Sequence, residues 1–210
     1  DAGGLWDKYP VEQVATPEGY ARNPELVINF YNERRKQLLE VRPNDGHLGL
    51  AELEADFNVT VVTQNIDNLH ERAGSRRIIH LHGELTKVCS SRDPYNPHYI
   101  KELKPDEYEV KFGDKAGDGT QLRPFIVWFG EPVPEIETAV NYVEKADIFV
   151  IIGTSMNVYP AAGLLNYVPR EAEVYLIDPK PVDVHSMRRI HVIQKGASEG
   201  VRELRSLLQP

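Results

Sequence analysis

The chain has 210 residues, a single cysteine and a formal net charge of −8 at pH 7. This length suits one domain, or one domain with an insert. The acidic balance argues against non-specific nucleic-acid binding and weakly favours basic partners such as lysine-rich polypeptides. One cysteine, Cys89, excludes an internal disulfide and a multi-cysteine zinc site. With neither a long apolar span nor a secretory leader pattern in this sequence, we expect a cytoplasmic protein that does not bind membranes.

The first part of the chain predicts three helices and one buried strand. Asn23-Pro24 is typical of a helix N-cap and its first helical residue. An apolar stripe at helical spacing follows, formed by Val27, Phe30, Tyr31, Arg34 and Leu38. The elements expected next are a helix over 47–56, a strand over 59–63, a short helix over 68–73 and a short apolar segment at 78–79.

Regular periodicity fails between residues 88 and 122, where prolines and glycines are frequent. This stretch is too long for an ordinary loop, so we expect an inserted small module there. The rest of the chain, 1–87 and 123–210, would form the main domain. We expect the module to be metal-free and packed by its aromatic residues Tyr95, Tyr99, Tyr108 and Phe112.

Order resumes after residue 122. The expected elements are a strand over 125–129 ended by Gly130, a helix over 136–145, a doubly buried strand over 148–152, a strand over 174–177 and a helix over 200–208. Strands that alternate with helices predict an α/β fold with a doubly wound parallel sheet.

Two polar motifs follow apolar segments at neighbouring positions in the chain. Gln64-Asn65-Ile66-Asp67 follows the strand over 59–63, and His82 follows Ile78-Ile79. Side chains at the carboxyl ends of adjacent strands converge on one crevice, so an amide, a carboxylate and a histidine are expected to share a site. His82 is the candidate general base, because an unperturbed histidine titrates near neutral pH. Asp67 could instead cap the helix that follows.

Two further strand ends are weaker signals. Gly153-Thr154-Ser155 could hold phosphate or ribose, and Asp178 could bind ribose hydroxyls. Taken alone, each is explained at least as well by an ordinary turn.

Arg34 lies on the apolar stripe of the first long helix, three residues after Tyr31. A buried guanidinium needs an anionic partner. The side chain could reach water beside an internal salt bridge. Alternatively, Arg34 and Tyr31 could bind the carboxylate of a ligand.

The segment Val127-Trp128-Phe129-Gly130-Glu131 combines aromatic residues with a strand-ending glycine. Core packing explains part of this pattern. The alternative is a backbone edge to which an extended peptide adds as a strand.

Taken together, the motifs of this chain resemble those of the sirtuins. The matching segments, in family order, are Gly3-Gly4-Leu5-Trp6, Thr63 to Asp67, His82-Gly83, Val127 to Glu131 and Gly153-Thr154-Ser155. Tyr31 and Arg34 match the Tyr-x-x-Arg signature of the class III branch, which prefers succinyl and malonyl groups.

The resemblance implies NAD-dependent removal of acyl groups from protein lysines on a Rossmann-like sheet, by an enzyme that is often a monomer. It implies catalytic roles for His82 and Asn65. The implied cofactor-binding residues are Gln64, Asn65, Ile66, Asp67, Gly153, Thr154, Ser155, Asp178 and Ala197. The implied substrate-binding residues are Tyr31, Arg34, Val127, Trp128, Phe129, Gly130, Glu131 and Val158.

Two departures from the family pattern stand out. The chain starts after the strand and glycine-rich loop with which sirtuins begin, so we expect the biological protein to be longer. The four zinc-binding cysteines of most sirtuins are represented here only by Cys89, so we predict that no zinc is bound. Two alternatives to the deacylase remain: a protein ADP-ribosyltransferase, and a non-catalytic module that binds NAD, ADP-ribose or acylated peptides.

Overall fold

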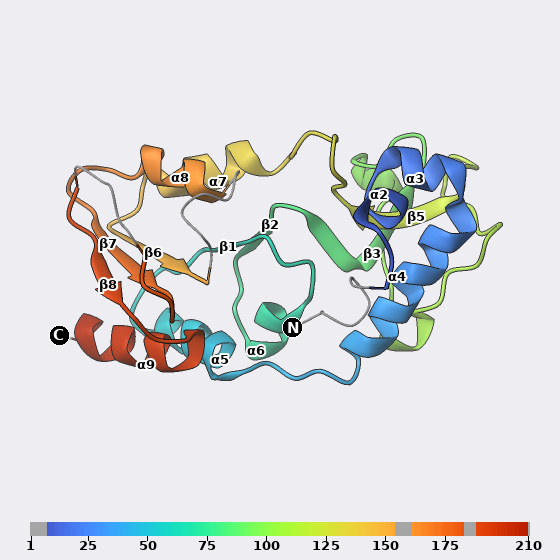
Figure 1. The fold of residues 1–210 in the computed structure, drawn as a ribbon. Helices are drawn as coiled ribbons and strands as arrows, with labels where there is room; N and C mark the ends of the chain where they lie inside the picture. The colour runs from blue at the N-terminus through green and yellow to red at the C-terminus, as the bar shows by residue number, and fades with distance from the viewer. Residues whose placement is uncertain (1–7, 154–160, 183–187, 210) are drawn as a thin grey trace. The chain divides into compact units, whose positions relative to one another are not determined.

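The computed structural model describes residues 8–153, 161–182 and 188–209 of the chain (Figure 1). The predicted site residues Thr154, Ser155 and Val158, and the Gly3–Trp6 motif, lie outside these ranges. The described chain forms two compact units. The first takes the chain up to Val41, together with 65–68 and 80–134, and the second takes 42–64, 69–79 and 135 onward.

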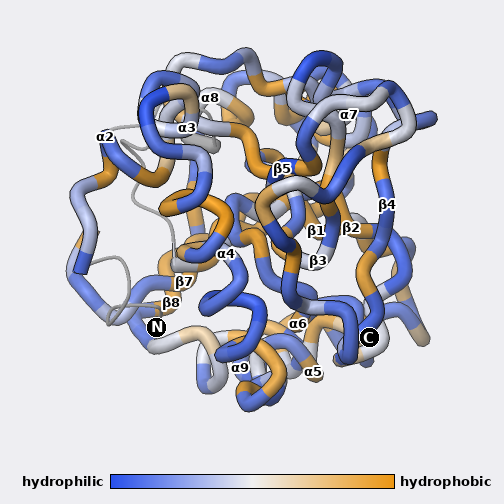
Figure 2. The backbone as a smooth tube through the Cα atoms, turned by 90° about the vertical axis from the view of Figure 1, so that its right-hand side faces the viewer, coloured by the Kyte–Doolittle hydropathy of each residue, from blue (hydrophilic) through white to orange (hydrophobic). Residues whose placement is uncertain are grey.

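Three helices begin the first unit: α2 (Val11–Val14), α3 (Pro17–Arg22) and α4 (Pro24–Leu38). As predicted, α4 begins at Asn23, whose side chain accepts a hydrogen bond of 3.2 Å from the amide of Leu26, with Pro24 as the first helical residue. The hydrophobic residues of α4 lie mostly in its first half and are followed by a run of hydrophilic residues (Figure 2). The buried face of α4 includes Val27, Phe30 and Tyr31.

A small antiparallel sheet completes this unit. Strand β3 (Gly83–Ser90) pairs with β4 (Lys101–Glu102) on one side and with β5 (Leu122–Ile126) on the other. Two short 3-10 turns, η2 (Pro97–Tyr99) and η3 (Pro105–Glu107), flank β4. The aperiodic stretch at 88–122 therefore contributes β4 and the end of β3 to this sheet and belongs to the same compact unit as α4.

Two polar residues of α4 hold this stretch in place. Asn32 donates to the carbonyl of Val110 (2.7 Å) and accepts from its amide (2.9 Å). Arg35 donates to the carbonyls of Tyr108 (2.7 Å) and Leu85 (3.3 Å). Burial lowers the pKa of Arg35 to about 10, which still leaves it charged at neutral pH. These bonds satisfy backbone groups in a segment that has little regular structure.

The expected aromatic packing of the 88–122 stretch is only partly correct. Tyr95 packs edge-on against Phe125, with ring centroids 6.4 Å apart, and Tyr99 lies against Gly117. Phe112, in contrast, is 60% exposed and does not help to fill a core. The reason is its place in a tight turn, where Lys111 and the positive-φ Gly113 bond to Asp114 and Gln121.

The second unit contains a parallel sheet in the order β6 (Ile148–Ile152), β7 (Glu173–Ile177), β8 (His191–Ile193). In Figure 1, α7 (Ile136–Val143) and α8 (Ala161–Leu164) lie on one side of this sheet, and α5 (Asp45–Glu52) and α9 (Ala197–Leu208) on the other. The remaining elements are η1 (Leu53–Ala55), β1 (Val61–Thr63), α6 (Leu69–Ala73), β2 (Ile78–His80) and η4 (Leu165–Tyr167). The predicted α/β class with a Rossmann-like parallel sheet is confirmed.

Close helix contacts form the core of the second unit. A Cβ atom at Gly200 of α9 would overlap the side chain of Ile177, and one at Gly49 of α5 would press on Val201. Tyr175, Ile177, Ile193, Val201 and Leu204 form the buried cluster beneath α9. Strand β6 was expected to be buried on both faces, but all five of its residues are only half-buried, because β6 is an edge strand of this sheet.

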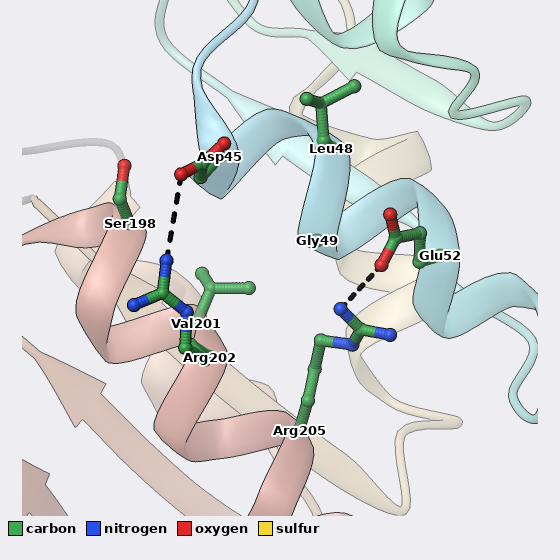
Figure 3. A pocket seen from close by; sticks show the side chains of 8 residues that line it. All are labelled: Asp45, Leu48, Gly49, Glu52, Ser198, Val201, Arg202 and Arg205. Atoms are coloured by element: carbon green, nitrogen blue, oxygen red, sulfur yellow. Dashed lines mark ion pairs between the residues drawn. The ribbon is translucent and has the colours of Figure 1, made fainter.

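A pocket of about 230 Å³ lies between α5 and α9 (Figure 3). Arg202 pairs with Asp45 at 3.6 Å and Arg205 with Glu52 at 2.5 Å across its wall. None of the predicted site residues that the structure describes lines this pocket. Among the described residues, no helix is long and apolar enough to cross a membrane.

Candidate functional site

His82 lies in the tight turn between β2 and β3 and is half-buried. Its carbonyl oxygen accepts a hydrogen bond of 2.9 Å from the amide of Val127. Burial lowers the pKa of His82 below its ordinary value of 6.5, because desolvation disfavours the charged imidazolium. The ring is therefore neutral at physiological pH and is able to accept a proton.

Gly83, the residue after His82, can only be glycine in this conformation. Its φ is +87°, and a Cβ atom there would overlap the carbonyl oxygen of Phe125. Gly83 also pairs with Ile126 in the β3–β5 ladder. The close approach of β3 to β5 thus fixes the backbone from which the His82 side chain extends.

The predicted segment Gln64 to Asp67 directly follows β1, as expected. Two hydrogen bonds hold its central part in the first unit. The carbonyl of Ile66 accepts from the amide of Leu85 (2.8 Å), and the carbonyl of Asn65 lies 2.9 Å from Nδ1 of His80. The His80 ring is buried, and its Nε2 lies 3.9 Å from a carboxylate oxygen of Glu84. His80 therefore orients the backbone beside Asn65.

Arg34 and Tyr31 lie in α4 of the same unit. The half-buried Arg34 has a pKa lowered by burial, and electrostatic interactions with Tyr31 and Asp67 act in the opposite direction. Arg34 and Asp67 are thus electrostatic neighbours. The fully buried Tyr31 hydroxyl donates to the carbonyl of Val14 (2.9 Å) and accepts from Nε1 of Trp128 (3.0 Å). Burial raises the pKa of Tyr31 to about 12.

The Val127–Glu131 segment is not the continuation of a strand. Strand β5 ends at Ile126, so the predicted strand over 125–129 was placed three residues too late. Residues 128–131 instead form a turn, closed by a hydrogen bond of 3.0 Å from the amide of Glu131 to the carbonyl of Trp128, with φ of +91° at Gly130. Trp128 is buried, whereas the next side chain, Phe129, is 69% exposed.

The remaining predicted cofactor residues lie in the second unit, at the carboxyl ends of its strands. Gly153 follows β6 with φ of +62°, and its amide donates to the carbonyl of Ile177 (3.1 Å). Asp178 follows β7, and its side chain accepts a hydrogen bond of 2.8 Å from the amide of Lys180. This bond belongs to the ordinary turn that was the alternative to ribose binding. Ala197 is exposed at the first position of α9.

Sequence reasoning missed two site residues. His80 was given no role, although its ring supports the Asn65 backbone. Arg123 was not singled out, although it binds Glu131 through two hydrogen bonds. The signal for Arg123 was a charged residue within an apolar strand, paired in the same stretch with a glutamate of opposite charge.

Comparison with known proteins places this arrangement in one family. Residues 1–160 match the Sir2 family. This chain belongs to the Sir2 family. It is similar to a protein of Bacteroides thetaiotaomicron named NAD-dependent protein deacylase, with 85% identity over 210 residues, all of this chain and 90% of that protein. A Helicobacter pylori protein of the same name is 47% identical over 204 residues, which cover 97% of this chain and 86% of the relative.

Solved structures agree with this assignment. A Sir2 homologue in complex with NAD has a TM-score of 0.79 and 35% identity, over 98% of this chain and 82% of that one. A structure described as Sir2 with a p53 peptide and NAD⁺ has a TM-score of 0.70 and 26% identity, over 90% of this chain and 79% of that one. The sirtuin resemblance inferred from the motifs is confirmed.

Proposed function

We propose that this Sir2 family member removes acyl groups from protein lysines in an NAD-dependent reaction, giving nicotinamide and O-acyl-ADP-ribose, with a preference for acidic groups such as succinyl and malonyl. The observation that carries the proposal is the half-buried His82, whose backbone is held by Gly83 and Val127 and whose pKa is lowered by burial. The 85% identity to an NAD-dependent protein deacylase supports the same reaction.

The residues present fit NAD. Within the part of the chain that the structure describes, no atom beyond its chain neighbours lies within 4 Å of where a Cβ would lie at Gly153. The half-buried Asp178 offers a carboxylate at the end of the neighbouring strand, and carboxylates at this position suit ribose hydroxyls. When bound, NAD would supply an electrophilic ribose carbon for the acyl-lysine oxygen and nicotinamide as the leaving group.

His82 and the residues of the 64–67 segment carry the chemistry in this proposal. The neutral imidazole of His82 takes a proton from a ribose hydroxyl. Asn65, Ile66 and Asp67 contact the nicotinamide ribose and carboxamide, with Asn65 as the second catalytic residue. Gln64, Thr154, Ser155 and Ala197 complete the proposed cofactor contacts.

Recognition of the acyl group is assigned to α4. Arg34 is a half-buried cation, so a ligand carboxylate would offset part of its desolvation. Tyr31 would have to donate its hydroxyl proton to the ligand carboxylate, in exchange for its present hydrogen bond to the carbonyl of Val14. An acetyl group has no carboxylate and would gain nothing from Arg34, which is the physical basis of the proposed preference.

The polypeptide around the lysine is assigned to Val127–Glu131 and Val158. The amides of Val127 and Phe129 already donate to the carbonyls of His82 and Ala15. An extended substrate would therefore pair mainly with carbonyl groups of this segment and supply its own N–H donors.

We further propose that the enzyme is a cytoplasmic monomer without zinc. The stretch 88–122, which contains β4 and is tied to α4 by Asn32 and Arg35, would replace the zinc-binding module. Metal analysis of the purified protein tests this proposal, and one zinc per chain would refute it.

Matched succinyl-lysine and acetyl-lysine peptides, incubated with and without NAD and followed by mass, test the function. NAD-dependent loss of succinyl, faster than loss of acetyl, is the expected result. A mass gain of ADP-ribose on a protein target would indicate the transferase. Unchanged peptides despite NAD binding would indicate a non-catalytic binding module.

A further inference from the structure

Arg123 is a buried cation that the reaction proposed above does not use. It is 4% exposed. Its Nη1 and Nη2 donate to the two carboxylate oxygens of Glu131, each at 3.1 Å, and Nη2 also donates to the carbonyl of Ile126 at 2.8 Å. A fork of two parallel bonds fixes both distance and orientation, which a single ion-pair contact would not do.

The carboxylate of Glu131 is likewise held by several hydrogen bonds. Besides its two bonds to Arg123, its Oε1 accepts a hydrogen bond of 2.8 Å from the amide of Trp128. Tyr95 lies close to Glu131. Burial, and after it the charge of Glu131, raises the pKa of Tyr95 to about 12. The carboxylate predicted to bind substrate is thus used inside the protein, where it bridges Arg123 and the start of the 128–131 turn.

Trp128 is held from two further directions. The guanidinium of Arg123 lies over the indole ring, 3.9 Å from its centroid, in a cation–π contact. The indole Nε1 donates to the hydroxyl of Tyr31 in α4, and this hydroxyl donates to Val14. One connected chain of contacts therefore runs from Glu131 through Arg123 and Trp128 to the helix that carries Arg34.

This chain of contacts decides which aromatic side chain of the turn faces inward. Trp128 is 2% exposed and its neighbour Phe129 is 69% exposed. With Trp128 fixed inside, Phe129 and Gly130 are presented at the surface with one backbone conformation. A preorganised edge binds an extended peptide with a smaller loss of conformational entropy than a loose one.

We propose that Arg123 and Glu131 are positioning residues that hold the 128–131 turn in the conformation that binds the acyl-lysine peptide. The inference rests on the proposed deacylase function and names the device that builds its peptide site. The pair acts on the peptide backbone and not on the acyl group. Loss of the pair therefore weakens the binding of succinyl and acetyl peptides alike, whereas loss of Arg34 affects mainly succinyl peptides.

The test compares Glu131→Gln, Glu131→Ala and Arg123→Lys with the wild-type enzyme. In Glu131→Gln the amide oxygen still accepts from Trp128 and from one Nη of Arg123, but the amide nitrogen cannot accept the second bond, so the fork is broken with the smallest change of shape. Glu54→Gln is the matched control, because Glu54 pairs with the exposed Arg76 in the second unit. Melting temperatures establish which variants are folded, and Glu131→Gln decides the matter if the other two are not.

Peptide affinity is measured by anisotropy of labelled succinyl and acetyl peptides, and NAD affinity by calorimetry. We expect the peptide Kd and KM of Glu131→Ala to rise about tenfold for both acyl groups, with kcat and the NAD Kd changed less than about threefold. In a Trp6→Phe background, acrylamide should quench the fluorescence of Trp128 more strongly in Glu131→Ala than in the protein with Glu131. An unchanged peptide Kd in folded variants, an equal loss of NAD affinity, or a loss confined to succinyl would each overturn the proposal.

Direct peptide binding separates this inference from the proposed function. If the wild-type enzyme binds acylated peptide without turnover, the function is wrong and the variants still test the positioning role. If turnover is normal in every variant and peptide Kd does not change, the positioning role is wrong and the function stands.

Discussion

The carbonyl oxygen of His82 accepts a hydrogen bond of 2.9 Å from the amide of Val127. The candidate general base and the first residue of the candidate peptide segment are therefore joined by their backbones. The bond continues the β3–β5 pairing by one step beyond Gly83 and Ile126. Any change that moves β3 away from β5 should displace both residues together.

Replacement of His82 by tyrosine should abolish NAD-dependent deacylation, because a neutral phenol is a far weaker proton acceptor than an imidazole. General-base catalysis typically contributes a factor of about 10²–10⁴. Turnover is measured by peptide mass and peptide binding by anisotropy. The peptide Kd should change little, since the His82 carbonyl and its bond to Val127 belong to the backbone. Turnover within tenfold of wild type would remove His82 from the mechanism.

The pH dependence of kcat/KM should show an acidic limb below pH 6.5. Burial lowers the pKa of His82 from its ordinary 6.5, so the ring stays in its neutral, proton-accepting form to a lower pH than a free histidine. Rates are measured between pH 5 and 8 with a peptide whose own groups do not titrate there. A limb centred above the ordinary value would mean that His82 is stabilised as the imidazolium, contrary to its desolvation.

Gly83→Ala should destabilise the protein by about 2–5 kcal/mol, since positive φ and a steric overlap both oppose it. The overlap is with the carbonyl of Phe125. Gly113→Ala is the control: its φ is +108°, but no atom lies within 4 Å of the new Cβ, so it should cost only about 1–2 kcal/mol. Urea unfolding measures both. Equal losses would show that the β3–β5 approach is not tight at Gly83.

Arg34→Met should reduce kcat/KM for succinyl-lysine by roughly a hundredfold, the equivalent of about 2–3 kcal/mol for a lost charge-assisted contact. Activity on acetyl-lysine should change much less. Arg35→Met is the matched control on the same helix, because Arg35 binds the carbonyls of Tyr108 and Leu85. This control should lower stability without altering the succinyl-to-acetyl ratio. Equal effects of Arg34→Met on both substrates would make Arg34 structural.

Asp118 should make the protein more stable at neutral than at acidic pH. Hydrogen bonds from Ser90 and Thr120 lower the pKa of Asp118 from 3.8 to about 2. A depressed folded-state pKa contributes stability above pH 3.8 that is lost as the pH falls toward 2. Asp118→Asn should therefore reduce stability at pH 7 and have a smaller effect near pH 2, as measured by urea unfolding. In a Ser90→Ala background, this pH dependence should shrink; if it persists unchanged, the Ser90 bond is not its cause.

Strand and helix positions that depend on local patterns were predicted closely. The helix start at Asn23-Pro24 and the strand over 148–152 match α4 and β6, because capping and apolar runs act within a few residues. The end of β5 was misplaced, because Val127 and Trp128 have the composition of a strand. The amide of Val127 bonds to the backbone of His82, which is distant in sequence, and the amide of Trp128 bonds to the side chain of Glu131. No local sequence pattern reveals these two contacts.

By itself, the sequence determined the family, the α/β class and the residue types of the candidate site. Motifs such as Gln64 to Asp67, His82-Gly83 and Tyr31 with Arg34 are short and keep their chemistry wherever the chain places them. Only the tertiary structure decided how those groups are used. Packing around Arg123 and Trp128 turns Glu131 inward, and burial sets the pKa directions of His82 and Arg34. The reason is physical: desolvation and hydrogen-bond partners come from segments far apart in the sequence, and these exist only once the chain has folded.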